Sequence, residues 1–150
     1  MVIVDVNTGE VLSLVSYPSY DPNIFSRTIS NKEWNAINSD VSRPIFNRAT
    51  QGNYAPGSTF KLLVAMSALE NKAVTADETI YASGIYPYGY KPKCWIYTSV
   101  GAIHGYITVS TAIKVSCNCY FYEVGRRLGI EHIVEYCKRF GLRLKNWYRA

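Results

Sequence analysis

A helix that is apolar on almost every side constrains the fold of this 150-residue chain more than any other feature. The turn Pro56-Gly57 leads into residues 58–69, whose apolar side chains surround the helix axis: Leu62, Leu63, Ala65, Met66, Ala68 and Leu69. A helix without a polar face is buried inside a large domain. We therefore expect this helix to lie at the centre of a core, for which the apolar content of 48% is ample.

A hairpin and a short helix are predicted before the central helix. β-Branched runs at 2–6 and 11–16 flank a turn in which Gly9 can adopt the positive φ of a tight reversal, so they indicate a hairpin. An S-x-x-E pattern opens residues 30–39 and predicts a capped helix there. Residues 40–57 are expected to form an extended loop.

Three short helices are predicted towards the end of the chain. Residues 79–105 are rich in Tyr, Gly and Pro and are expected to form loop and short strand. Helical segments follow at about 108–115, 118–128 and 130–140, and the last two each end in a basic pair, an apolar residue and a glycine. Cations and glycine suit a helix C-terminus. Strands and helices together predict an α+β fold.

Charge and hydropathy exclude several classes of protein. The net charge of +5 comes from basic residues that are scattered except at 126–127 and 138–149, whereas nucleic-acid binding proteins usually show a clustered basic stripe. We interpret the charge as a solvated surface, which leaves a membrane or polyanion partner open. There is no run of about 18 apolar residues, so no membrane span is predicted, and the first residues do not form a signal peptide. The chain begins within a strand pattern, which suggests a piece of something longer.

Four cysteines occur, at positions 94, 117, 119 and 137. The spacing Cys117-x-Cys119 is not that of a zinc site, and no histidine is near enough in sequence to complete one, so we predict buried thiols and no metal. A pairing of Cys94 with Cys117 is conceivable in an oxidising compartment, but the sequence does not determine it.

The residues with catalytic chemistry begin with Ser58 and Lys61. Three residues apart on a helix, their side chains are neighbours on one face. A serine hydroxyl needs a base that removes its proton, and burial lowers the pKa of a lysine so that it can be that base. The alternative is a capping serine and a lysine that reaches solvent, which such a short motif does not exclude.

A second pair, Ser116 and Asn118, lies between two predicted helices. Both residue types are common helix caps, which is the alternative interpretation. A serine can also relay a proton, and an asparagine amide can hold a polar backbone group of a peptide substrate.

Together these motifs resemble the first two signatures of penicillin-binding proteins. The resemblance extends over "DVNTGEVLSLVSYPSYDPN", "NRATQGNYAPGSTFK" and "HGYITVSTAIKVSCNCYFYEVGRRLGIEHIVEYCKRFGL", and so over nearly all of residues 2–142. It is strongest to the transpeptidase domain of class B proteins, in the branch that builds side-wall peptidoglycan. The implied fold is the N-terminal part of a transpeptidase domain like that of the serine β-lactamases, with a hairpin of its sheet and a helical subdomain.

The resemblance implies a role for each site residue. Ser58 would be the nucleophile that a D-Ala-D-Ala stem peptide or a β-lactam acylates, and its backbone N–H would form half of the oxyanion hole. Lys61 would be the base, Ser116 the proton relay to the leaving group, and Asn118 a substrate-binding amide. No cofactor is implied. The implied partners are membrane-bound cell-wall synthesis proteins, and the implied parent is anchored in the cell membrane with this domain outside the cytoplasm.

Two departures from the family are visible. The third motif, Lys-Thr/Ser-Gly, does not occur in the chain, so we expect the chain alone to be inactive. Residues 143–150 also depart from the family pattern, and with suitable codons a shift of one base turns them into a family-like Arg-Thr-Gly-Ile-Glu. We therefore expect domain sequence over 1–142 and an out-of-frame tail over 143–150.

Two interpretations besides a transpeptidase remain open at this stage. Class D β-lactamases and β-lactam sensors also use Ser-x-x-Lys, but they usually carry an apolar residue where Asn118 stands. The third interpretation is a truncated product without catalysis.

Overall fold

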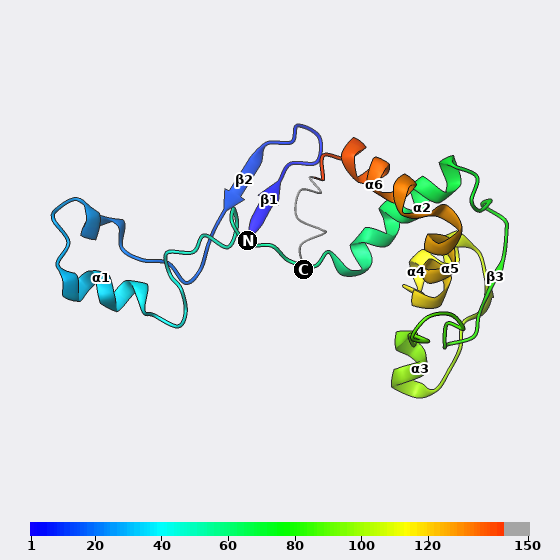
Figure 1. The fold of residues 1–150 in the computed structure, drawn as a ribbon. Coiled ribbons are helices and arrows are strands. Elements are labelled where there is room, and N and C mark those ends of the chain that lie inside the picture. Colours follow the sequence, from blue (N-terminus) through cyan, green and yellow to red (C-terminus); the bar gives the residue numbers. More distant parts are fainter. Residues whose placement is uncertain (143–150) are drawn as a thin grey trace. The chain divides into compact units, whose positions relative to one another are not determined.

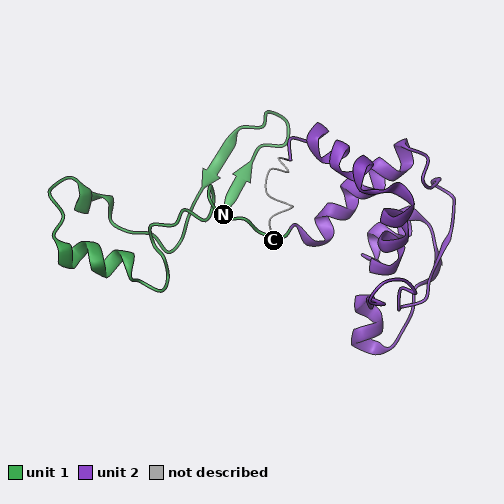
Figure 2. Cartoon of the chain, viewed as in Figure 1, with its two compact units in different colours: residues 1–55 green, residues 56–150 purple. Residues whose placement is uncertain are grey.

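The computed structural model describes residues 1–142, and the predicted out-of-frame tail at 143–150 lies outside the described residues. The chain divides into two compact units (Figure 2). Unit 1 comprises Met1–Ala55, and unit 2 begins at Pro56. Each unit is described by itself.

A short antiparallel hairpin opens unit 1. Strand β1 (Val2–Val4) pairs with β2 (Val11–Leu14) (Figure 1). In the turn, the carboxylate of Asp5 accepts hydrogen bonds from two backbone N–H groups, and Gly9 has a φ of 76°. The predicted hairpin is confirmed, with strands shorter than 2–6 and 11–16: the turn begins at Asp5, and β2 ends at Leu14.

Helix α1 (Asn31–Asn38) is the other regular element of unit 1, after a 3₁₀ turn at Pro22–Phe25. The side chain of Ser30 accepts a hydrogen bond from the backbone of Glu33, and the Glu33 carboxylate accepts one from the backbone of Ser30. The predicted capping box is therefore present. The following segment contains turns, as expected for a loop.

Unit 2 contains most of the regular structure. Its elements are a 3₁₀ turn η2 (Gly57–Thr59), α2 (Phe60–Glu70), β3 (Ile80–Ala82), α3 (Trp95–Val100), β4 (Gly105–Ile107), α4 (Val109–Lys114), α5 (Asn118–Leu128) and α6 (Ile130–Arg139). Strands β3 and β4 pair antiparallel, and α2, α5 and α6 contact one another (Figure 1).

The helices at the end of the chain agree closely with the predicted segments, but α3 was missed. Its six residues fall within the stretch 79–105 that the sequence predicts as loop and short strand. Six residues are too few for helical periodicity to show, and no side chain caps the N-terminus of α3. The helix ends where Gly101 adopts a left-handed conformation with a φ of 69°.

The helix α2 lies in the core of unit 2 but keeps one exposed apolar face. Residues such as Val64, Ala65 and Ala68 are buried against α5 and its neighbours. In contrast, Leu62, Met66 and Leu69 are 52%, 45% and 39% exposed. Within the described residues, one face of α2 is therefore buried as predicted and the opposite face is exposed to solvent, which the sequence argument did not predict. Among residues 1–142, no helix is long and apolar enough to cross a membrane.

Candidate active site

Ser58 and Lys61 lie on consecutive elements of unit 2. Ser58 is exposed and lies in the 3₁₀ turn η2, so it precedes the α-helix on which it was predicted. Lys61 is the second residue of α2 and is half-buried. The backbone changes direction at Gly57, the first residue of η2, whose φ of 57° is a value that glycine adopts without strain. The chain thus presents the serine to solvent at the start of a helix whose next turns are buried.

Ser116 occupies a strained position between α4 and α5. Its φ is 51°, in the left-handed region that non-glycine residues rarely adopt. Its N–H donates to the carbonyl of Ile113, and the next N–H, that of Cys117, donates to the carbonyl of Ala112. Strained backbone of this kind persists only where surrounding contacts determine it, and it concentrates at functional sites.

A continuous hydrogen-bonded path joins the two motifs. The hydroxyl oxygens of Ser58 and Ser116 are 2.7 Å apart, and Lys61 Nζ lies 3.0 Å from Ser116 Oγ. Lys61 Nζ also donates to the carbonyl of Ser116 at 2.8 Å and to Asn118 Oδ1 at 2.7 Å. All four predicted site residues therefore meet at one place, although 55 residues separate Lys61 from Ser116.

The path runs through Ser116 and not directly from Ser58 to Lys61. Within the described residues, no hydrogen bond joins Ser58 Oγ to Lys61 Nζ. The sequence argument treats these two side chains as neighbours on one helix face. Because Ser58 precedes the α-helix, that geometry does not apply to them, and the hydroxyl of Ser116 bridges the two groups.

Burial acts against the charged form of Lys61. Burial lowers its pKa from the ordinary value, against smaller opposing effects of Cys117 and Cys94, whereas the ring of Phe121, 5.7 Å from Nζ, favours the charged form. A neutral amine keeps two N–H bonds and one lone pair. The two carbonyl oxygens at 2.8 and 2.7 Å can accept both N–H bonds, which leaves the lone pair to Ser116 Oγ.

Asn118 is held at both its backbone and its side chain. Its backbone N–H donates to the sulfur of Cys94 at 3.3 Å, and its Oδ1 accepts from Lys61. The amide nitrogen of its side chain makes no hydrogen bond within the described residues, so it is available as a donor to a carbonyl of a bound molecule.

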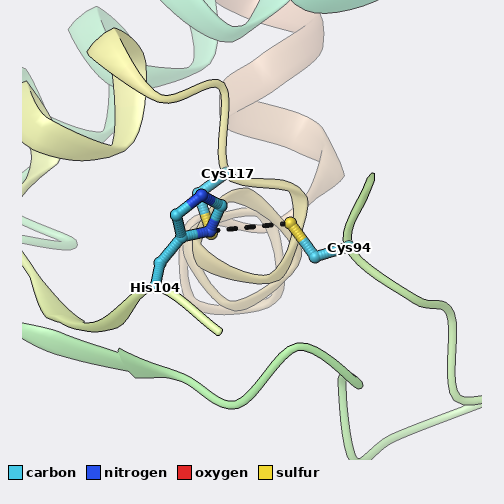
Figure 3. A group of neighbouring side chains, drawn as sticks. All are labelled: Cys94, His104 and Cys117. Atoms are coloured by element: carbon cyan, nitrogen blue, oxygen red, sulfur yellow. Dashed lines mark hydrogen bonds between the residues drawn. The ribbon is translucent and has the colours of Figure 1, made fainter. Parts of the chain in front are cut away.

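Sequence reasoning missed a second cluster beside the site, formed by Cys94, His104 and Cys117 (Figure 3). Their ligand atoms all lie within 4.8 Å of one another, and Cys94 Sγ is 3.8 Å from His104 Nδ1. The argument that no histidine is near enough for these cysteines is wrong, because the fold places His104, just before β4, beside Cys94, just before α3, and Cys117, just before α5. The absence of a metal stays a prediction.

The chemistry of this cluster suits a thiophilic divalent ion such as Zn²⁺, for which it offers three ligands. Burial lowers the pKa of His104, and the positive charge of Lys61 adds to this effect. Burial raises the pKa of Cys117 to about 12. Burial also opposes ionisation of Cys94, but hydrogen bonds from backbone N–H groups outweigh it and lower that pKa. All four cysteines are buried free thiols, as the sequence predicts, and the conceivable Cys94–Cys117 disulfide is not formed.

The chain matches one family over almost its whole length. Residues 1–146 match the family described as "Penicillin binding protein transpeptidase domain". The chain is 39% identical over 142 residues to the peptidoglycan D,D-transpeptidase MrdA of Escherichia coli K12. That alignment covers 94% of this chain and 22% of the relative, so the chain spans about a fifth of that protein.

Solved structures of similar proteins show the same fold. One is PBP2 of Pseudomonas aeruginosa in complex with WCK 5153, with a TM-score of 0.83 and 36% identity, covering 93% of this chain and 32% of that one. Another is PBP2 of Helicobacter pylori in complex with MreC, with a TM-score of 0.83 and 32% identity, covering 93% of this chain and 26% of that one. The predicted fold class, part of a transpeptidase domain, is confirmed.

Proposed function

Because the chain belongs to the penicillin-binding protein transpeptidase family, we propose that it is the nucleophile-bearing part of a serine D,D-transpeptidase. Such an enzyme cross-links peptidoglycan stem peptides through an acyl-enzyme, and β-lactams acylate the same serine. The observation that carries the proposal is the hydrogen-bonded path from Ser58 through Ser116 to Lys61. In this path Ser58 would be the nucleophile, Ser116 the proton relay and Lys61 the base.

Acylation follows from this path. Ser58 Oγ attacks the carbonyl carbon of the penultimate D-Ala or of the lactam, while its proton passes to Ser116 Oγ and the proton of Ser116 passes to the lone pair of Lys61 Nζ. The resulting ammonium is stabilised by the two carbonyl oxygens that already accept from it. When the tetrahedral intermediate collapses, Lys61 returns a proton through Ser116 to the departing nitrogen.

The remaining parts of the site would come from two sources. The amide nitrogen of Asn118 is free to donate to the substrate backbone, and the backbone N–H of Ser58 would form half of the oxyanion hole. The other half and the carboxylate-binding Lys-Thr/Ser-Gly strand are not in this sequence. We therefore expect the 150-residue chain alone to be inactive.

Asn118 also favours a transpeptidase over a class D β-lactamase. Its Oδ1 lies 2.7 Å from Lys61 Nζ, so it takes part in the same polar network as the base. An apolar residue at this position, as class D enzymes usually carry, could not accept that hydrogen bond. We place the complete enzyme on the outer side of the cell membrane, with membrane-bound cell-wall synthesis proteins as partners, in line with the MreC complex of the H. pylori protein.

The test uses a chimaeric domain in which residues 1–142 replace the segment of E. coli MrdA that they match. Fluorescent penicillin should label the chimaera at Ser58, and Ser58→Ala should abolish labelling. Lys61→Met should slow acylation by about 100-fold or more, because general-base catalysis contributes that much. The controls are Ser110→Ala and Lys138→Met, which change exposed residues on α4 and α6.

Two results would contradict the proposal. One is labelling of another serine after Ser58→Ala, and the other is a rate unchanged by Lys61→Met. The unmodified 150-residue chain should give no labelling above its own Ser58→Ala control, because losing one oxyanion-hole donor alone costs about 100- to 1,000-fold in rate. Stoichiometric labelling of that chain would instead mean that the third motif is dispensable.

A further inference from the structure

A tryptophan outside the catalytic motifs holds the strained turn at Ser116. Trp95 is the first residue of α3, and its indole Nε1–H donates to the carbonyl of Val115 at 3.1 Å. That carbonyl belongs to the peptide group between Val115 and Ser116. We infer that Trp95 is a positioning residue for Ser116, an inference that rests on the proposed function of the Ser58–Ser116–Lys61 path.

The peptide group that Trp95 contacts controls the conformation of Ser116. Turning this peptide plane changes ψ of Val115 and φ of Ser116 together, so it is the motion that would take φ from 51° to an unstrained negative value. Such a turn would move the Val115 carbonyl away from the indole N–H. The hydrogen bond from Trp95 therefore opposes relaxation of the strained residue.

The other polar atoms of the turn are held by different groups. The Ser116 N–H donates to Ile113 within the end of α4, and the Ser116 carbonyl accepts from Lys61. Among the described residues, the Val115 carbonyl receives its hydrogen bond from Trp95 alone. The peptide group between Val115 and Ser116 is therefore held by a hydrogen bond within the turn and by the Trp95 indole. Among the described residues, the indole is its only hydrogen-bond partner from outside the turn.

The residue before Trp95 acts on the far end of the same turn. Cys94 Sγ accepts the backbone N–H of Asn118 at 3.3 Å. The dipeptide Cys94-Trp95 therefore contacts the turn on both sides of Ser116, before it at Val115 and after it at Asn118. Because Cys94 is fully buried, the start of α3 is anchored in the core of unit 2. A rigid anchor of this kind is what a precise hydroxyl relay requires.

The test removes the indole donor in the chimaeric domain described above. Trp95→Phe removes the N–H, and replacement of Trp95 by 3-benzothienylalanine removes it while keeping the shape of the ring. The matched control is Trp34→Phe, which changes a similarly exposed tryptophan on α1 in unit 1. Two quantities are measured: penicillin acylation, separated into binding and the acylation step, and amide hydrogen exchange of the peptide that contains residues 116–118.

Both substitutions of Trp95 should lower the rate of the acylation step about tenfold, the effect of one net hydrogen bond, with penicillin binding and the melting temperature little changed. Exchange at 116–118 should become faster, while exchange in α2 stays the same. An acylation step as fast as in the unmodified chimaera, or unchanged exchange at 116–118, would overturn the inference. Failure of the unmodified chimaera to label at Ser58 would instead refute the proposed function, and the exchange measurement would still decide the role of Trp95.

Discussion

Residues 1–55 and residues 56–142 are held together in different ways. Among the described residues of unit 1, only Pro44 is buried, and both strands of its hairpin are largely exposed. Most of its side-chain hydrogen bonds are local, such as the capping box at Ser30 and the Asp5 turn, and Ser16 also contacts the backbone at residues 46 and 48. Unit 2 instead has a continuous core that joins α2, β3, β4, α4 and α5.

This difference explains where the candidate site lies. Local hydrogen bonds position groups that are a few residues apart, whereas the proposed relay needs atoms 55 and 58 residues apart to be within 3.0 Å. A packed core suits this task, because interiors are close-packed and resist deformation. All four site residues accordingly lie in unit 2.

The largest expected effect contrasts one leucine from each unit. Leu128→Ala removes a side chain that is 4% exposed at the end of α5, whereas Leu12→Ala removes one that is 65% exposed on β2. The first should cost about 2–5 kcal/mol, and the second less than about 0.5 kcal/mol. Hydrogen exchange of the amides in α5 and in the hairpin measures the free energy of opening in each unit. Equal costs would remove the contrast between the units.

The next effect is the response of each unit to acid. The Glu123 carboxylate accepts hydrogen bonds from Arg126, Arg127 and Tyr86, and the first of these is the main cause that lowers its pKa to about 2. Since the folded pKa lies below the ordinary 4.5, the stabilisation is complete above pH 4.5 and is lost as the pH falls towards 2.

Glu123→Gln should therefore lower the melting temperature at pH 7 and flatten its dependence on pH between 4.5 and 2. Glu33 in unit 1 also has a pKa of about 2, chiefly because of Arg27, but it lies at the surface. Exposed ion pairs contribute little, so Glu33→Gln should have a smaller effect. A pH profile of Glu123→Gln as steep as that of the unsubstituted chain would disprove this assignment.

A smaller effect concerns the capping box of α1. Ser30→Ala removes the side-chain acceptor for the Glu33 N–H and should cost about 1 kcal/mol. Because unit 1 has almost no buried side chains, faster exchange should be confined to α1. Ser30→Thr keeps the acceptor and is the control. Faster exchange in α5 after Ser30→Ala would contradict this expectation.

The smallest effect has the opposite sign. The hydroxyl of Tyr120 is buried and makes no hydrogen bond within the described residues. Tyr120→Phe should therefore leave stability unchanged or raise it by up to about 1 kcal/mol, since an unpaired buried polar group is costly. In contrast, Tyr86→Phe removes a donor to Glu123 and should destabilise unit 2. The melting temperatures of both variants test this prediction. A clearly lower melting temperature for Tyr120→Phe would mean that the Tyr120 hydroxyl does make a hydrogen bond.

Much of the secondary structure could be predicted because its causes are local. The hairpin, the capped helix α1 and the three last helices depend on turn residues, caps and periodicity within a few positions. The helix α3 could not be predicted, because its six residues carry no cap and too little periodicity. The starting point of α2 was also placed too early, since a 3₁₀ turn and an α-helix have similar sequence patterns.

The sequence by itself pointed to the four candidate residues, Ser58, Lys61, Ser116 and Asn118, because their motifs stand within a family resemblance that extends over nearly all of residues 2–142. Only the tertiary structure decided that Ser116 bridges Ser58 and Lys61, and that the start of α3 contacts the turn around Ser116. It also decided that Cys94, His104 and Cys117 lie together. The physical reason is common to all three. These contacts join segments that are apart in the chain, and the packing of unit 2 brings them together. No short sequence pattern encodes that packing.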